Sequence, residues 1–312
     1  MKKMILCLLC LCSLLAYATE EPVVLHVDGF DIHGTLRVPE ADSAVPVALI
    51  IAGSGAADRD GNSPGMINNS NKMLAEGLNA NGVATLNTDK RGIAASANPD
   101  AKEEDLRFED YIKDASLWID FLADDPRFSE VFIIGHSEGS LIGMCVAKDN
   151  PKVDAFVSLA GVGVSGDVIL KKQLGEQSAM LLEIVTPMID RLKAGELLGE
   201  VDPMLMSLFR PSVQPYIISW FQYDPAEIIK QLTIPVLIIN GTTDIQVGVE
   251  QAELLQDAKP DAKLVLIENM NHVLKDAEVA NRIAQLPVYM DPDLPLSAEL
   301  IPAITDWVKS WE

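Results

Sequence analysis

The feature that most constrains this chain is a Gly-x-Ser-x-Gly pattern at residues 135–139, which reads Gly-His-Ser-Glu-Gly. An apolar run at 131–134 precedes it, and a helix-compatible run follows Ser137. A serine on so tight a strand-to-helix turn takes a strained backbone conformation, and Gly135 and Gly139 leave the room that the turn needs. The hydroxyl then lies at a helix N-terminus, where free N–H groups and the helix dipole favour developing negative charge. The pattern alone could be an ordinary glycine-rich loop, but in this context it predicts a nucleophile at Ser137.

Apolar runs alternate with amphipathic segments on both sides of this turn. Strands are expected at 46–52, 83–87, 131–134, 155–161, 235–240 and 263–267, and helices at 69–81, 108–124, 248–258 and 300–311. Such alternation predicts an α/β fold, with a mostly parallel sheet between two layers of helices. Two short strands around Asp28-Gly29 predict an opening hairpin, and the Pro- and Asp-rich segment 285–295 is expected to be a loop.

The alternation stops between residues 166 and 226, where no strand is evident and apolar residues follow helical spacing. This predicts a mostly helical cap inserted into a core made of residues 19–165 and 227–312. A cap over a site usually contributes apolar walls to it, so Trp220, Phe221 and Tyr223 are candidates for an acyl-pocket wall. The competing interpretation is that these aromatic residues form the cap's own core.

Residues 1–18 have the pattern of a cleavable signal peptide. Lys2 and Lys3 precede an apolar stretch at 5–15 that is too short for a stable membrane anchor, and Ala16-Tyr17-Ala18 fits a cleavage site. We therefore expect cleavage after Ala18 and export to the periplasm or out of the cell. The mature chain would keep only Cys145, so its core must stabilise it without an internal disulfide.

The charge of the chain restricts its partners. The formal net charge is −22, and removal of Lys2 and Lys3 with the leader makes it −24. The negative electrostatic field of such a chain repels nucleic acids and anionic lipids. A solvated acidic surface is enough to explain the charge. The cluster at 58–60, Asp-Arg-Asp, favours an ion-pair brace over a metal site because it lacks a complete ligand set. No cofactor or metal is expected, and the oligomeric state stays open.

Nucleophilic serine catalysis needs an imidazole that takes the hydroxyl proton. The chain has four histidines. His26 and His33 lie in the predicted hairpin, and His136 adjoins Ser137 and cannot easily reach its hydroxyl. His272, in a loop after the last core strand, is the remaining candidate for the base.

A carboxylate must orient that imidazole. Asp244 follows the strand at 235–240, so it lies at the same carboxyl edge of the sheet as Ser137, where parallel sheets place their sites. Asp257 and Asp261 are rivals, but a helix end and a turn place them at the opposite edge. The predicted triad is therefore Ser137, Asp244 and His272.

The strand at 46–52 leads into a glycine-rich loop at 53–62. The loop has neither the spacing of a Walker motif nor that of a dinucleotide fingerprint. We expect an oxyanion loop instead, in which the backbone N–H of Ser54, or that of Gly55, faces the Ser137 hydroxyl. The Glu138 carboxylate could be mistaken for an acid catalyst, but a structural role in the first turn of a helix is favoured.

The order Ser137, Asp244, His272 resembles that of the α/β-hydrolase superfamily, and the resemblance covers essentially the whole mature chain. More narrowly, the chain is similar to exported bacterial esterases that carry a Gly-Ser-Gly-x-x-Asp-Arg-Asp-Gly-Asn loop, here 53–62, and an Asp-Lys-Arg-Gly turn, here 89–92. The resemblance implies serine carboxylesterase activity on small-molecule esters, with oxyanion donors from Glu138 and the residue after Gly53. The chain has Ala56-Ala57 where these esterases have Pro-Thr.

Two alternatives remain open. The same triad could act on a peptide or a thioester, or transfer the acyl group to an acceptor other than water. A prolyl peptidase usually has a large second domain, against which the short cap argues. The chain could also be a non-catalytic binding protein on a hydrolase scaffold, although such proteins generally lose a triad residue and all three positions are filled here.

Overall fold

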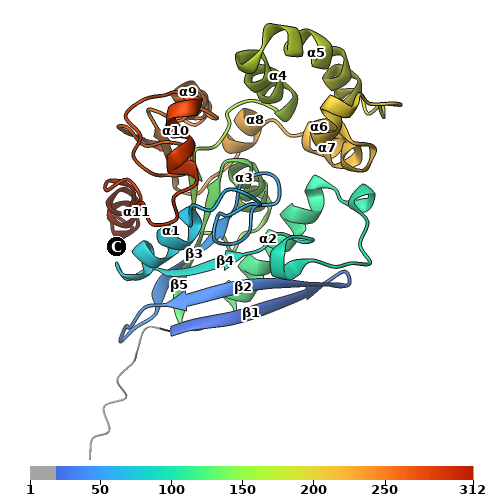
Figure 1. Cartoon of the computed structure of the whole chain (residues 1–312). Coiled ribbons are helices and arrows are strands. Elements are labelled where there is room, and N and C mark those ends of the chain that lie inside the picture. Colours follow the sequence, from blue (N-terminus) through green and yellow to red (C-terminus); the bar gives the residue numbers. More distant parts are fainter. Residues whose placement is uncertain (1–18, 312) are drawn as a thin grey trace, which may run out of the picture.

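The computed structural model describes residues 19–311, so the expected leader and its cleavage site after Ala18 lie outside the described residues. Its centre is an eight-stranded sheet with the order β1-β2-β4-β3-β5-β6-β7-β8 (Figure 1). The strands are β1 (Thr19–Val27), β2 (Phe30–Val38), β3 (Val45–Ile51), β4 (Ala84–Thr88), β5 (Phe128–His136), β6 (Ala155–Leu159), β7 (Val236–Gly241) and β8 (Lys263–Ile267). From β4 to β8 every pairing is parallel, while β2 pairs antiparallel with β1 and β4. The predicted α/β class, with a mostly parallel sheet, is confirmed.

The opening hairpin turns at two residues with left-handed backbone. Asp28 has φ 51° and Gly29 φ 80°, and Val27 pairs with Phe30 across them. Two positive φ angles in a two-residue loop match the right-handed twist of the flanking strands. The turn that Asp28-Gly29 predicted is therefore formed.

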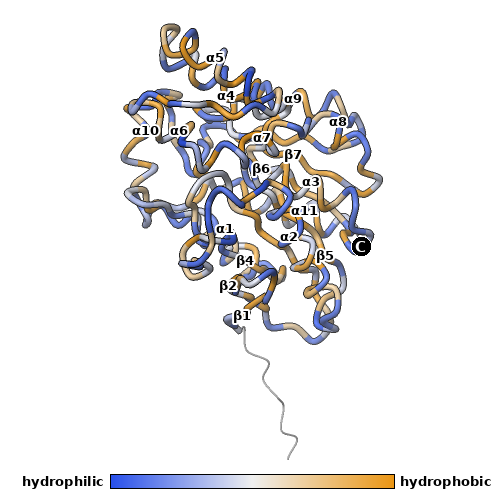
Figure 2. Tube along the Cα trace, turned by 90° about the vertical axis from the view of Figure 1, so that its right-hand side faces the viewer, coloured by the Kyte–Doolittle hydropathy of each residue, from blue (hydrophilic) through white to orange (hydrophobic). Residues whose placement is uncertain are grey.

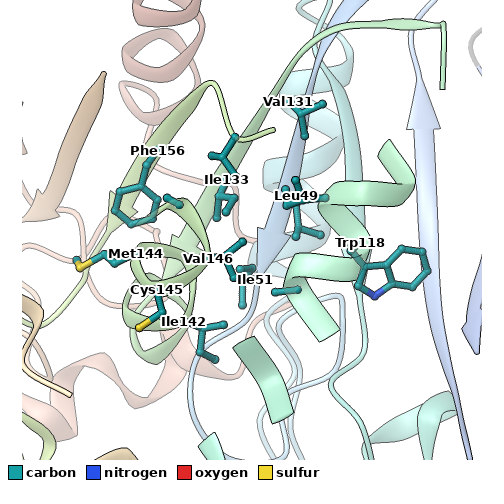
Figure 3. Close-up of a cluster of buried hydrophobic side chains, with 14 of the residues drawn as sticks. Leu49, Ile51, Trp118, Val131, Ile133, Ile142, Met144, Cys145, Val146 and Phe156 are labelled. Atoms are coloured by element: carbon teal, nitrogen blue, oxygen red, sulfur yellow. The ribbon is translucent and has the colours of Figure 1, made fainter. Parts of the chain in front are cut away.

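Helices cover both faces of the sheet, as Figure 1 shows. They are α1 (Ser70–Asn79), α2 (Phe108–Ala123), α3 (Glu138–Asp149), α9 (Val249–Ala258) and α11 (Leu300–Lys309). Side chains along β3 alternate between the two faces: Leu49 and Ile51 join the cluster that includes α2 and α3, whereas Ala48 and Ile50 join the one that includes α1 and α11. Figure 3 shows the first cluster, with Trp118 of α2 and Ile142 of α3 beside β3.

A helical segment separates β6 from β7. It contains α4 (Gly166–Gln177), α5 (Ala179–Lys193), α6 (Met206–Phe209), α7 (Gln214–Trp220) and α8 (Pro225–Ile229). Figure 1 shows α4 to α7 grouped at the top of the view, away from the hairpin of β1 and β2. The segment has an apolar cluster of its own, which includes Val185, Ile189, Phe209 and Phe221. In Figure 2 the turns of α5 alternate between hydrophobic and hydrophilic colours, as expected for a helix with one buried face.

The expectation of a loop at 285–295 is wrong for its first part, because α10 spans Arg282–Tyr289. The side chain of Asn281 accepts hydrogen bonds from the backbone N–H groups of Ile283 and Ala284, which caps the helix. The Gln285 amide donates to the Thr243 carbonyl oxygen at 2.8 Å, so a tertiary contact holds a short helix that contains Pro287. Nowhere in residues 19–311 is a helix long and apolar enough to span a lipid bilayer.

Candidate active site

Ser137 occupies the sharp turn between β5 and α3. Its backbone angles are φ 54° and ψ −121°, a left-handed conformation that costs energy for a residue with a side chain. A Cβ added to Gly135 would lie 2.3 Å from the Gly139 carbonyl oxygen, and one added to Gly139 would lie 2.3 Å from the Ile51 carbonyl oxygen. Only glycine fits at these two positions, because main chain packs directly against main chain around the serine.

His272 and Asp244 form a hydrogen-bonded pair at the same edge of the sheet. Nδ1 of His272 lies 2.8 Å from Oδ2 of Asp244, and the carboxylate has no exposed side-chain surface. The other oxygen, Oδ1, accepts the backbone N–H groups of Gln246 and Val247. Because an ionised carboxylate only accepts, Nδ1 of His272 carries the proton and Nε2 is left as the acceptor. The rival Asp261 instead pairs with Lys259, and Asp257 lies within α9.

Close backbone packing brings these two side chains together. A Cβ added to Gly241 would lie only 1.9 Å from the Met270 carbonyl oxygen. The Thr243 N–H donates to that same oxygen at 3.2 Å. The loops after β7 and β8 therefore contact each other through main-chain atoms. This contact places Asp244 within hydrogen-bond distance of His272.

His136 is buried against His272, a contact that the sequence did not predict. Its Nε2 donates to the His272 carbonyl oxygen at 2.9 Å, and the ring centroids are 4.9 Å apart. Burial, followed by repulsion from His272, lowers the pKa of His136 from 6.5 to about 3. A neutral imidazole therefore supports the loop that carries His272.

The glycine-rich loop after β3 passes directly against Ser137. A Cβ added to Gly53 would lie 3.1 Å from Cβ of Ser137. The next two residues, Ser54 and Gly55, are exposed. The carbonyl oxygen of Gly53 accepts a hydrogen bond from Nζ of the buried Lys90 at 2.6 Å. This position is compatible with an oxyanion donor from the Ser54 N–H.

The Glu138 side chain is buried and partnered on both oxygens. Its Oε1 accepts the Tyr216 hydroxyl at 2.7 Å, and its Oε2 lies 3.6 Å from Nζ of Lys90. Tyr216 belongs to α7, so this contact joins the helical segment to the turn that carries the serine. These contacts agree with the structural role favoured for the carboxylate. Neither Tyr216 nor Lys90 was among the residues predicted for the site.

The Asp58–Asn62 part of the loop is braced internally and against Asp89, the residue that follows β4. Oδ1 of Asp58 accepts the N–H groups of Asp60 and Asn62. Arg59 pairs with the buried Asp89 at 2.5 Å, and its backbone N–H also donates to that carboxylate. These are the contacts of an ion-pair brace. Among residues 19–311, no three His, Cys, Asp or Glu side chains group as metal ligands.

The three aromatic candidates for an acyl-pocket wall differ in what they contact, although the ring centroids of Trp220 and Phe221 are only 5.4 Å apart. Phe221 has no exposed surface and packs within the core of the helical segment. Tyr223 donates to Glu109 and lines a cavity beside Cys145. The structure therefore gives no support to these two as wall residues. Trp220 is the exception, because it packs against a small cluster that contains Val247, close after Asp244.

A cavity of about 620 Å³ lies between α4 and α10, next to the acid of the pair. Its lining includes Lys172 and Glu176 of α4, Asp244, and Leu286 and Tyr289 of α10. This volume suits a small organic molecule, and its walls combine apolar and charged groups.

A mostly parallel sheet with a serine on a tight strand-to-helix turn, and an acid and a histidine after two later strands, defines an α/β-hydrolase. The chain has the α/β-hydrolase fold. A model of the family described as serine aminopeptidase, S33, matches residues 63–206, a range that contains Ser137 but neither Asp244 nor His272.

Known proteins similar to the chain include two distant relatives by sequence. Esterase EstD of Thermotoga maritima is 26% identical over 253 residues, which are 78% of this chain and 58% of EstD, so the chain spans under two thirds of that relative. A monoglyceride lipase homolog of Monkeypox virus is 23% identical over 252 residues, 73% of this chain and 83% of the homolog.

Solved structures share the fold over almost the whole chain. Est1E from Butyrivibrio proteoclasticus, with ferulic acid bound, has a TM-score of 0.60 and 20% identity, and the match covers 93% of this chain and 97% of that one. A proline iminopeptidase of Mycobacterium smegmatis has a TM-score of 0.60 and 13% identity, with 93% and 98% covered. At these identities the likeness shows the fold alone.

Proposed function

We propose that this protein is a serine carboxylesterase that hydrolyses small to medium carboxylic esters through an acyl-enzyme on Ser137. The observation that carries the proposal is the 2.8 Å hydrogen bond from His272 to Asp244, at the sheet edge where Ser137 sits on its strained turn. The esterase EstD, 26% identical, supports the choice of an ester substrate.

The proposed reaction begins when Oγ of Ser137 attacks the ester carbonyl carbon and Nε2 of His272 takes the hydroxyl proton. The carbonyl oxygen becomes an oxyanion that accepts the N–H groups of Glu138 and Ser54. Collapse of this intermediate breaks the ester C–O bond, and His272 gives the proton to the departing alcohol. Asp244 stabilises the imidazolium in between, because its buried carboxylate is already fixed on Nδ1.

Water then hydrolyses the acyl-enzyme, and His272 again acts first as a base and then as an acid. His272 removes a proton from the water as it attacks the acyl carbon of the Ser137 ester. Collapse of the second oxyanion releases the carboxylic acid and returns the proton to Oγ. Every group in this scheme belongs to the chain, and the reaction consumes only ester and water.

The test is hydrolysis of nitrophenyl esters with acyl chains from acetyl to octanoyl by the chain starting at Thr19. Ser137→Ala is expected to lower kcat by at least about 10⁴-fold, and Asp244→Asn by about 10⁴-fold because the wrong imidazole tautomer forms. Both variants should keep the wild-type melting temperature within a few degrees. A Ser137→Ala protein that turns over esters at the wild-type rate overturns the proposal.

A second candidate is an amide or aminoacyl hydrolase with the same three residues. It is favoured by the serine aminopeptidase family model and by the fold of the proline iminopeptidase. The assay therefore includes aminoacyl-nitroanilides and acyl thioesters beside the nitrophenyl esters. A higher kcat/KM on nitroanilides replaces the first candidate with the second. Failure of wild-type protein to react with a fluorophosphonate probe favours a non-catalytic binding protein.

We also propose that the enzyme works outside the cytoplasm, on a small-molecule ester and not on a nucleic acid. The support is the signal-like sequence at 1–18 together with the net charge of −22. Sequencing the N-terminus of protein recovered from a periplasmic extract tests this: a chain beginning at Thr19 is expected, and an intact Met1 in the cytoplasmic fraction contradicts it.

A further inference from the structure

Lys90 is a buried cation, and two of its contacts are with residues beside Ser137. Its Nζ donates to the Gly53 carbonyl oxygen at 2.6 Å, lies 3.6 Å from Oε2 of Glu138, and stands 5.3 Å from the centroid of the Tyr111 ring. Burial lowers the pKa of Lys90, and the Glu138 carboxylate opposes that change. Because a buried charge is costly unless it is paired, the site of this ammonium calls for an explanation.

The first contact fixes the direction of an N–H group. The Gly53 carbonyl and the Ser54 N–H belong to one planar trans peptide, in which they point in opposite directions. A lysine that holds the carbonyl oxygen therefore also aims the Ser54 N–H. This peptide lies against the nucleophile, since a Cβ on Gly53 would be 3.1 Å from Cβ of Ser137.

The second contact reaches the other expected donor. The Glu138 N–H is the first free N–H of α3 after the nucleophile, and the side chain of the same residue is held by Lys90 on one oxygen and by Tyr216 on the other. One ammonium thus touches both segments that supply donors to the oxyanion: the Gly53–Ser54 peptide and the first residue of α3.

We propose that Lys90 is a positioning residue for the oxyanion hole, which holds the N–H groups of Ser54 and Glu138 at a fixed separation. The inference rests on the proposed function, because it assumes an oxyanion at Ser137. Lys90 touches no reacting atom in this scheme. It acts through the Gly53 carbonyl and the Glu138 carboxylate, and the Tyr216 hydroxyl completes the arrangement from the helical segment.

The neighbouring Arg91 provides a matched control. It is also buried, but it pairs with Asp114 of α2 at 2.5 Å and with Asp28 of the hairpin turn at 3.5 Å. It therefore anchors the turn after β4 without contact to Gly53 or Glu138. If Lys90 only anchored the turn, substitution of either cation would have the same effect on catalysis.

The experiment compares Lys90→Met and Arg91→Met with wild type on a nitrophenyl ester, at a temperature where circular dichroism shows each to be folded. Lys90→Met is expected to lower kcat by about 10- to 100-fold, less than the 10²- to 10³-fold that loss of a whole donor costs, with KM within about twofold. Affinity for a trifluoromethyl ketone, which binds as an oxyanion adduct, should fall by the same factor. Arg91→Met should lower the melting temperature but keep kcat and ketone affinity within about threefold.

The outcomes separate this inference from the proposed function. Should Lys90→Met fail to fold because Glu138 is left unpaired, the double variant Lys90→Met/Glu138→Gln removes that unpaired charge and is measured in its place. If kcat and ketone affinity are unchanged in the folded variant, the positioning role of Lys90 is wrong. The proposed esterase function is not affected by that result. An inactive wild type, or an active Ser137→Ala protein, overturns the proposed function instead.

Discussion

Nε2 of His136 donates a hydrogen bond to the carbonyl oxygen of His272 at 2.9 Å, so the residue before the proposed nucleophile supports the loop of the proposed base. The donor nitrogen carries a proton in the neutral ring, and the low pKa of about 3 keeps the ring neutral. The two histidines differ in their surroundings: Asp244 faces Nδ1 of His272, whereas His136 meets a backbone carbonyl.

His136 should make the stability of the protein sensitive to acid. Its pKa is about 3 in the folded chain and 6.5 in the unfolded chain, so between these pH values only the unfolded chain binds the proton. The free energy of unfolding should therefore fall by about 1.4 kcal/mol for each pH unit below 6.5 on account of this residue, and the contribution is complete above pH 6.5. In His136→Gln, urea unfolding between pH 4.5 and 7 should show a shallower dependence on pH.

The control for this prediction is His26→Gln. His26 lies on the surface, with 76% of its side chain exposed, and pairs only with Asp31. Its substitution should leave the free energy of unfolding at pH 7 within about 0.5 kcal/mol of wild type. Identical slopes for wild type and His136→Gln would show that the buried ring has no part in the acid response.

Gly139→Ala should disrupt the turn that carries Ser137. The new methyl group would lie 2.3 Å from the Ile51 carbonyl oxygen and 2.7 Å from that of Ala52, and neither main-chain atom can move aside cheaply. We expect a loss of more than about 3 kcal/mol of stability and no labelling by a fluorophosphonate. Gly199→Ala, at a glycine with open space around it, should stay within about 0.5 kcal/mol of wild type and label normally. Equal melting temperatures for the two variants would contradict the packing described for the turn.

Phe209→Ala should destabilise the helical segment from within. Phe209 has no exposed surface and packs with Val185, Ile189 and Phe221, so its truncation opens a cavity that costs about 3–5 kcal/mol. Met204 in the same segment is 88% exposed, and Met204→Ala should change stability by less than about 0.5 kcal/mol. Urea unfolding followed by tryptophan fluorescence measures both, and a Phe209→Ala protein as stable as Met204→Ala would rule out a packed core here.

The central sheet could be predicted because its strands are continuous apolar runs. Strands buried on both faces leave a signal in the sequence that needs no knowledge of their neighbours. The strand expected at 235–240 is β7 (Val236–Gly241), in which every residue is buried. The proposed triad follows from the same reasoning, since the ends of parallel strands meet at one edge. The hydrogen bond of Asp244 and His272 lies at that edge, and Asp261 pairs with Lys259 elsewhere.

The side-chain contacts around the site could not be predicted in the same way. Tyr216 lies in a helical segment whose spacing indicates which face is buried but not which distant carboxylate its hydroxyl meets. For the same reason the spacing could not show where Phe221 lies. It was a candidate for a pocket wall, and it packs in the apolar cluster of the helical segment. α10 was missed because Pro287 is a helix breaker by local rules, while the contact of Gln285 with Thr243 comes from the tertiary fold.

The bond between Tyr216 and Glu138 ties two parts of the chain that lie far apart in the sequence. Glu138 directly follows the proposed nucleophile, while Tyr216 lies in the insert between β6 and β7. We therefore expect substitutions in that insert to alter turnover at the proposed nucleophile, even where they do not contact it. Transplanting a different insert onto this sheet would preserve the reaction rate only if the new segment again brought a hydroxyl to the same carboxylate oxygen.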